Sequence, residues 1–262
     1  MSASVRRLPR ALLAPAMVTA LFFLLPLVGL AVRAPWAEVL PRLGSPAVRD
    51  ALWLSLQCSL AAAGLSFVFG LPLAVWLAEG ASASRTAVRV LVTLPMVLPP
   101  VVGGVALLLA YGRSGLAGGP AGQLLGVFLP FSTAGVVVAE TYVAMPFFVL
   151  TAEAGLRAFD RRYADAAATL GASPWRTFVT VTVPMLAPSL RAGLLIAWAR
   201  ALGEFGATIT FAGNLAGETR TMPLAVYVAL ETEPEAAFVL SLLLVAVCCA
   251  VLFALRRRWF PA

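Results

Sequence analysis

Long apolar runs separated by short polar segments make up most of the chain. The runs lie at about residues 11–32, 52–78, 88–110, 132–152, 187–212 and 236–255. Each run provides the roughly 20 apolar residues that an α-helix needs to cross the hydrocarbon core of a bilayer. The pattern predicts an all-α, polytopic membrane protein with six transmembrane helices, organised as a single transmembrane domain over residues 1–262.

Two apolar segments need separate treatment. The first run follows the basic start MSASVRRLPR, which is typical of a secretory signal peptide, but at about 22 residues it is longer than the apolar part of most such peptides. A retained span is therefore favoured over a cleaved signal. The segment MPLAVYVAL at 222–230 is too short to cross the bilayer and predicts a small helix at the outer mouth.

Composition supports a membrane protein and argues against an enzyme. Apolar residues make up 61% of the chain and charged residues 12%, far from the balance of a soluble domain. The chain contains no His, and all 19 basic residues are Arg. Without Lys there is no phosphate-binding lysine of a P-loop, and without His there is no imidazole base or usual zinc ligand. We therefore expect no catalysis, no bound cofactor and no metal site, and we attribute the net charge of +7 to membrane topology rather than to nucleic acid.

Arginines are distributed unevenly between the two sides of the predicted bundle. One side carries Arg6, Arg7, Arg10, Arg85, Arg89, Arg157, Arg161, Arg162, Arg176, Arg256, Arg257 and Arg258. The other side carries Arg33, Arg42, Arg49, Arg113 and Arg220, and its last loop contains Glu218, Glu231, Glu233 and Glu235. Because basic loops stay on the cytoplasmic side, we expect both termini and the loop at 153–186 to face the cytoplasm.

The polar stretch DAAATLGASPWRTFVTVTVP at 165–184 interrupts the apolar pattern. Asp160 is a candidate N-cap for a helix that runs to Leu170, and Gly171 stands where a helix end favours a positive φ. Ser173 and Pro174 then predict the start of a second helix. The segment TFVTVTV alternates like a strand, but a lone strand would leave its backbone unpaired, so a helix is favoured. The stretch is either an interfacial helix on lipid or, with its small and weakly apolar face, a docking helix for a protein.

The same stretch resembles the EAA loop of the permeases of binding-protein-dependent ABC importers. The matching positions are Asp165, Ala166, Ala167, Gly171, Val181, Val183 and Pro184. Asp stands where the family usually has Glu, and Val replaces the usual Ile and Leu. The resemblance implies a type I ABC importer permease fold with a coupling helix seated in a separate ATPase subunit. The residues that it assigns to this contact are Asp165, Ala166, Ala167, Gly171, Ala172, Ser173 and Pro184.

Two further segments resemble the molybdate, tungstate and sulfate branch of that family, and its molybdate members most. They are TLPMVLPPVVGGVALLLAYGRSG at 93–115 and ARALGEFGATITFAGNLAGETRTMPLAVYVALE at 199–231. The resemblance implies an importer of an oxyanion in the inner membrane of a prokaryote. Its implied partners are a second permease copy, two ATP-binding cassette subunits that hold ATP and Mg²⁺, and an extracytoplasmic oxyanion-binding protein. A sulfate or thiosulfate permease, an ion-coupled secondary transporter and a scaffold without transport are the alternatives.

Two groups of residues are candidates for the translocation pathway. Pro99, Pro100 and Gly103 interrupt the third run near mid-membrane, where they form either a packed kink or part of a pathway. Arg200 and Glu204 in the fifth run, with Glu140 in the fourth, are charges at a depth where they need partners. We expect Glu204 or Glu140 to neutralise Arg200, either within the pathway or as a structural ion pair between spans four and five.

Small residues also recur every four positions in the fifth run. Gly193, Ala197 and Ala201 lie on one helix face and permit a close approach of another helix. The family resemblance implies that this span lines a passage between two permease copies.

Overall fold

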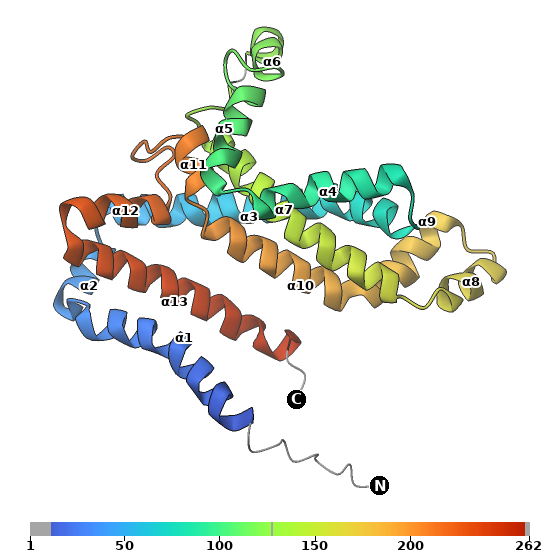
Figure 1. Ribbon diagram of the computed structural model, residues 1–262, viewed down its shortest axis with the longest axis horizontal. Helices are drawn as coiled ribbons and strands as arrows, with labels where there is room; N and C mark the ends of the chain where they lie inside the picture. The colour runs from blue at the N-terminus through green and yellow to red at the C-terminus, as the bar shows by residue number, and fades with distance from the viewer. Residues whose placement is uncertain (1–11, 127, 260–262) are drawn as a thin grey trace.

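The computed structural model describes residues 12–126 and 128–259, and within these ranges it contains helices and no strand (Figure 1). The helices are α1 (Leu13–Arg33), α2 (Trp36–Leu43), α3 (Pro46–Ala78), α4 (Ala83–Val97), α5 (Pro100–Tyr111), α6 (Gly118–Leu125), α7 (Thr133–Ala158), α8 (Arg162–Thr169), α9 (Pro174–Thr177), the π-helical turn η2 (Phe178–Thr182), α10 (Val183–Leu202), α11 (Gly206–Phe211), α12 (Met222–Thr232) and α13 (Pro234–Trp259). The all-α prediction is confirmed. Arg6, Arg7 and Arg10 lie outside the described residues, as do the side chains of Arg256, Arg257 and Arg258.

Five helical segments of the described chain are long and apolar enough to cross a membrane. They are Leu13–Arg33, Pro46–Ala78, Thr133–Ala158, Pro174–Leu202 and Pro234–Phe253. The third predicted span is instead divided into α4 and α5, because Leu98 and Pro99 adopt extended backbone angles between them. Pro100 then starts α5 at a position where its missing N–H costs nothing. The total of six crossings stays a prediction.

The fifth predicted span, at 187–212, is wrong at both ends. It begins earlier, because α9, η2 and α10 form one continuous helical segment from Pro174. It ends earlier as well, since α10 stops at Leu202 and a short turn leads into α11. The apolar pattern continues through this turn, so hydropathy alone conceals the break. The predicted short helix at 222–230 is present as α12.

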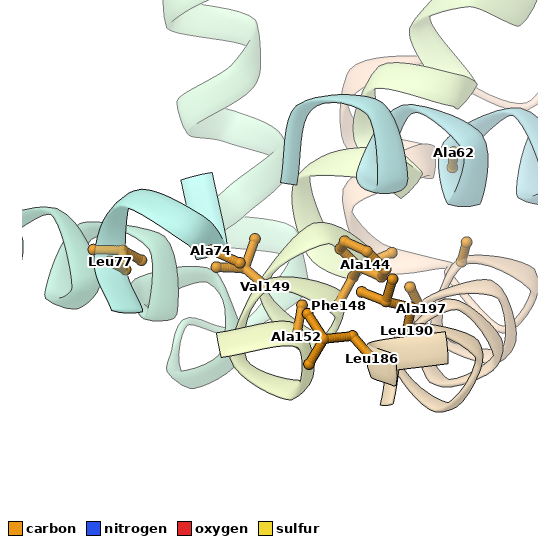
Figure 2. Packing of buried hydrophobic residues seen from close by; sticks show 11 residues of the cluster. Ala62, Ala74, Leu77, Ala144, Phe148, Val149, Ala152, Leu186, Leu190 and Ala197 are labelled. Atoms are coloured by element: carbon orange, nitrogen blue, oxygen red, sulfur yellow. The ribbon is translucent and has the colours of Figure 1, made fainter. Parts of the chain in front are cut away.

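Three helices, α3, α7 and α10, lie side by side and form the core of the molecule (Figure 1). Phe148 of α7 is fully buried at their junction, as Figure 2 shows. A Cβ on Gly70 of α3 would lie 2.9 Å from Cδ1 of Phe148, and one on Gly193 of α10 would lie 3.2 Å from Cδ2. Since lipid is as apolar as the helices, close van der Waals packing of this kind is what holds membrane helices together.

The stripe of small residues on α10 therefore has its partner within the same chain. Gly193, Ala197 and Ala201 are all buried, and Gly193 faces Phe148 and Thr151 of α7. The predicted close approach of another helix is correct, and that helix is α7.

The remaining helices surround this core unequally. In Figure 1, α8 and α9 lie at one end of the molecule and α2 and α12 at the other, while α5 and α6 project from one side. Helices α1 and α13 pair along the opposite side, and none of the residues of α1 is buried. The described start of α1 and end of α13 both point away from α2 and α12. That this direction is cytoplasmic remains a prediction.

An ion-pair cluster joins the helices at the end that carries α2. Arg42 of α2 donates to Glu38 at 2.7 Å and, through Nη1, to Glu233 at 3.1 Å. Glu233 lies between α12 and α13, so the cluster connects segments 191 residues apart in sequence. The hydrogen bond from Arg42 lowers the pKa of the Glu233 carboxyl.

The divided span is packed against the rest of the protein through glycine. Gly104 of α5 is buried against α11, where an added Cβ would lie 2.7 Å from Cβ of Thr210 and 2.9 Å from the carbonyl oxygen of Ala207. Gly206 of α11 faces Pro100 in the same way, at 2.9 Å. Two short helices thus make contact at backbone distance.

We predict that Gly104→Ala lowers the stability of the purified protein by about 1–3 kcal/mol, because the new methyl group meets backbone that cannot move aside. Gly64→Ala in α3 is the control, since no atom lies within 4 Å of its added Cβ. Alanine there favours the helix and leaves stability unchanged or slightly higher. Thermal unfolding in one lipid mixture measures both variants, and equal midpoints would contradict the packing argument.

Candidate functional site

The interrupted stretch forms a compact helix–turn–helix at one end of the molecule. Helix α7 ends at Ala158, and α8 begins at Arg162, so the helix expected from Asp160 starts slightly later. Asp160 still helps to start α8, since its Oδ1 accepts from the backbone N–H of Arg162 at 3.0 Å. Hydrogen bonds from the Arg162 side chain and backbone lower the pKa of the Asp160 carboxyl.

The turn after α8 depends on Gly171. Its φ is +83°, as the sequence predicts for this position, and no atom lies within 4 Å of where a Cβ would be. The N–H of Gly171 donates to the carbonyl of Ala168, and that of Ala172 to the carbonyl of Ala167. These two bonds form a Schellman motif, which satisfies carbonyls that the helix end would otherwise leave unpaired.

The second helix starts and continues as the sequence predicts. The Oγ of Ser173 accepts from the N–H of Arg176 at 3.3 Å, and Pro174 occupies the first helical position. The segment TFVTVTV is helical, so the strand alternative is wrong. A π-helical turn at Phe178–Thr182 precedes Pro184, which can neither donate to residue 180 nor fit its ring against that carbonyl in a regular helix.

The loop presents its apolar side chains to the outside. Tyr163 is 54% exposed, Leu170 is 87% exposed and Trp175 is 73% exposed. Asp165 and Ala166 are exposed too, and α8 contains no buried residue. Large apolar side chains exposed in this way are typical of a surface that contacts lipid or another protein.

A charged cluster that sequence reasoning missed lies where this loop leaves α7. Glu153 is only 4% exposed. Its Oε1 lies 2.6 Å from Nη2 of Arg89 and 2.9 Å from Nη2 of Arg157, so it forms an ion pair with each arginine. Both arginines also donate to the carbonyl of Leu77, at 3.2 and 3.3 Å, near the end of α3. A Glu and an Arg four residues apart signal the pair between Glu153 and Arg157, but nothing local signals Arg89.

The three charged residues predicted at membrane depth, Arg200, Glu204 and Glu140, form one ion pair between them, which does not include Glu140. Nη1 of Arg200 lies 2.5 Å from Oε2 of Glu204, as expected. Oε1 of Glu204 accepts from the N–H of Ala207 at 2.8 Å, so the same carboxylate caps the first turn of α11. Glu140 is 1% exposed, its Oε2 has no hydrogen-bond partner within the part of the chain that the structure describes, and it is not the partner of Arg200.

The candidate pathway residues of the divided span face two ways. Pro99 and Pro100 are exposed on one side of the break. Gly103 is buried on the other side, where an added Cβ would lie 3.1 Å from Cε1 of the Tyr142 ring. The break is therefore packed on its glycine side and open on its proline side. Among residues 12–126 and 128–259, no three His, Cys, Asp or Glu side chains form a group that could hold a metal ion.

Residues 68–261 match the family described as binding-protein-dependent transport system inner membrane component. Three similar proteins are each named "Molybdenum transport system permease protein ModB". The one from Mycobacterium tuberculosis is 43% identical, over 96% of this chain and 95% of its own length. That from Haemophilus influenzae is 40% identical over 78% and 91% of the respective chains. The protein from Escherichia coli K12 is 36% identical over 80% of this chain and 93% of its own length.

Solved ABC transporter structures share the fold. A bacterial transporter involved in the import of alginate superposes with a TM-score of 0.72 at 21% identity, covering 96% of this chain and 95% of that one. A bacterial alginate transporter in complex with an alginate-bound periplasmic protein superposes with a TM-score of 0.71 at 19% identity. The superposition covers 95% of this chain and 94% of that one. The inward-facing MetNI methionine transporter superposes with a TM-score of 0.61 at 19% identity, covering 81% of this chain and 94% of that one.

We predict that Arg200→Ala destabilises the protein by about 3 kcal/mol, because it leaves the buried carboxylate of Glu204 without a counter-charge. This value is at the low end for a buried pair, since the Arg200 side chain is 28% exposed. Combining Arg200→Gln with Glu204→Gln should recover most of the loss, because the new amide still accepts from Ala207. Thermal unfolding compares the variants, and a double variant as unstable as Arg200→Ala would contradict this account.

Proposed function

We infer that this chain, which belongs to the family of binding-protein-dependent transport system inner membrane components, is the permease subunit of an ATP-driven ABC importer for molybdate. The observation that carries the assignment is its 43% identity to a molybdenum transport permease along 96% of the chain. Because 96% of the chain is aligned, the compared region extends over the α8–α9 loop and the divided span as well as the core helices.

Energy for transport is expected to come from two separate ATPase subunits. The chain lacks the lysine of a P-loop, so ATP and Mg²⁺ would bind to those partners. Their docking site would be the turn between α8 and α9, where Leu170 and Trp175 are exposed and the backbone at Gly171 is open. Asp165, Ala166, Ala167, Ala172, Ser173 and Pro184 would complete this contact.

A second copy of the permease would complete the translocation pathway. Helix α1 is apolar up to its last turn, yet no residue in it is buried, and it contacts α13 and Trp36 of α2. The helices of a single copy also offer little surface to line a passage of its own. The small lining of a single copy supports a homodimer. The exposed faces of α1 are satisfied by lipid and are also free to meet the other copy.

The remaining partners follow from the same assignment. An extracytoplasmic oxyanion-binding protein would deliver molybdate to the end that carries α2 and α12, as the alginate transporter binds a periplasmic protein. The protein would lie in the cytoplasmic membrane of a prokaryote, with both termini and the α8–α9 loop in the cytoplasm. This orientation agrees with the excess of arginine at that end.

Within this scheme the pair of Arg200 and Glu204 would keep the passage from trapping its cargo. A dianion must leave as well as enter, and a deep unpaired arginine would slow its release. Because Glu204 neutralises Arg200 at 2.5 Å, such a trap is absent at this position. Uptake by the stable Arg200→Gln/Glu204→Gln variant would separate a pathway role from a structural one.

Transport by the reconstituted complex tests the proposed function. Vesicles that contain this chain, its ATPase and its binding protein should take up labelled molybdate only with ATP. Excess tungstate should compete, because it is also a tetrahedral dianion of similar size, whereas sulfate should not. Competition by sulfate would favour a sulfate permease, and uptake that survives loss of the ATPase but stops with a protonophore would favour a secondary transporter.

We further predict that Gly171→Glu releases the ATPase, because the side chain would fill the open face of the docking turn. The control is Gly217→Glu, which has a similar φ of +79° and equally open surroundings at the other end of the molecule. Both variants carry the strain of a non-glycine residue at positive φ, about 1–2 kcal/mol. Co-purification of the ATPase should fail only for Gly171→Glu, and normal co-purification would mean that the turn is not the docking site.

A further inference from the structure

The buried carboxylate of Glu153 joins three helices at the base of the α8–α9 loop. It lies in α7, about one turn before that helix ends, and only 6% of its side chain is exposed. Arg89 of α4 reaches it through both Nε, at 3.1 Å, and Nη2, at 2.6 Å. The same Nη2 of Arg89 donates to the carbonyl of Leu77, whose side chain Figure 2 places at the end of the core. One guanidinium thus connects α4 to α7 and to α3.

Helix α4 depends on this connection more than its neighbours do. No residue of α4 is buried, whereas α3, α7 and α10 share an extensive buried core. Val88 and Val92 are only partly buried against that core. Arg89 lies between them in sequence and makes the directional contact. A bidentate arginine–carboxylate pair fixes orientation as well as distance, which apolar contact alone does not.

The cluster adjoins the docking loop on one side. A cavity of about 220 Å³ separates the ends of α3 and α7 from α8. Its walls include Ala78 of α3, Leu156 and Phe159 near the end of α7, and Ala164 and Asp165 of α8. Leu156 is three residues after Glu153, about one helical turn. Because this cavity lies between them, a displacement of α8 reaches α7 through the short connection at residues 159–161 rather than through direct packing.

On its other side α4 leads to the divided span. It ends at Val97, and the extended residues Leu98 and Pro99 connect it to α5. Helix α5 packs on α11 at backbone distance through Gly104, and α11 is capped by Glu204. The α8–α9 loop is joined to α7 by residues 159–161, and from Glu153 the contacts continue through Arg89 and α4 to the break and the ion pair of Arg200 and Glu204.

We propose that Glu153 is a positioning residue that transmits movement of the α8–α9 loop to α4 through its ion pair with Arg89. The proposal rests on the function inferred above, in which an ATPase moves that loop. Removing the charge of Glu153 would leave the guanidinium groups of Arg89 and Arg157 facing each other beside Leu77. Helix α4 would then no longer follow α7, and ATP hydrolysis would proceed without a matching movement at the break.

The test is the ratio of molybdate transported to ATP hydrolysed in vesicles that contain the complete transporter. Glu153→Gln and Arg89→Gln should each lower this ratio by about fivefold or more, the smallest effect typical of lost coupling between sites. Basal ATPase activity and co-purification of the ATPase should stay at wild-type levels. A merely structural defect would instead lower transport, hydrolysis and the amount of assembled complex together.

Arg85→Gln is the matched control on the same helix. Arg85 lies one turn from Arg89 and also pairs with a glutamate, but its partner Glu79 belongs to the adjoining turn rather than to α7. The transport ratio should therefore be unchanged in this variant. If Glu153→Gln does not assemble, Arg89→Gln decides alone, because there Glu153 keeps its bond from Arg157 at 2.9 Å.

A wild-type ratio in both Arg89→Gln and Glu153→Gln would overturn the proposal. An equal loss in Arg85→Gln would do so too, since any disturbance of α4 would then have the same effect. Failure of the proposed substrate gives a different result: the wild-type transporter would not take up molybdate. In that case the ratio is measured with sulfate as the transported anion, and the comparison among the variants still decides the role of Glu153.

Discussion

The close fit of Phe148 between α3 and α10 is the contact on which the rest of this fold depends. In lipid there is no hydrophobic gain from bringing helices together, so their association relies on surfaces that match at van der Waals distance. Gly70 and Gly193 provide the space on either side of the ring, and Phe148 is completely buried as a result. With α3, α7 and α10 fixed in this way, the other helices can stand apart or break without loss of the core.

The breaks in the membrane helices use side-chain and proline chemistry to reduce the number of unpaired backbone groups. At the α10–α11 turn the carboxylate of Glu204 both pairs with Arg200 and accepts from the N–H of Ala207. At the α4–α5 junction, prolines remove the donors that would otherwise be unpaired. The two breaks then meet through Gly104 and Gly206.

The loop between α7 and α10 combines local rigidity with an open surface. Its hydrogen bonds at Gly171 and Ser173 fix the turn from within, while Leu170 and Trp175 remain exposed. Such a surface is costly in water unless a partner covers it. The ion pairs of Glu153 connect α7, near the base of this loop, to α4, the first half of the divided span.

The sequence by itself determined the helical class, most of the spans, the turn at Gly171 and the residues that carry the family resemblance. These features depend on apolar periodicity or on capping chemistry within a few residues, so they can be recognised locally. The packing of whole helices is what places Gly193 against α7 and brings Glu153 to Arg89 from 64 residues away. Contacts between distant segments depend on how whole helices pack, and no short stretch of sequence encodes that arrangement.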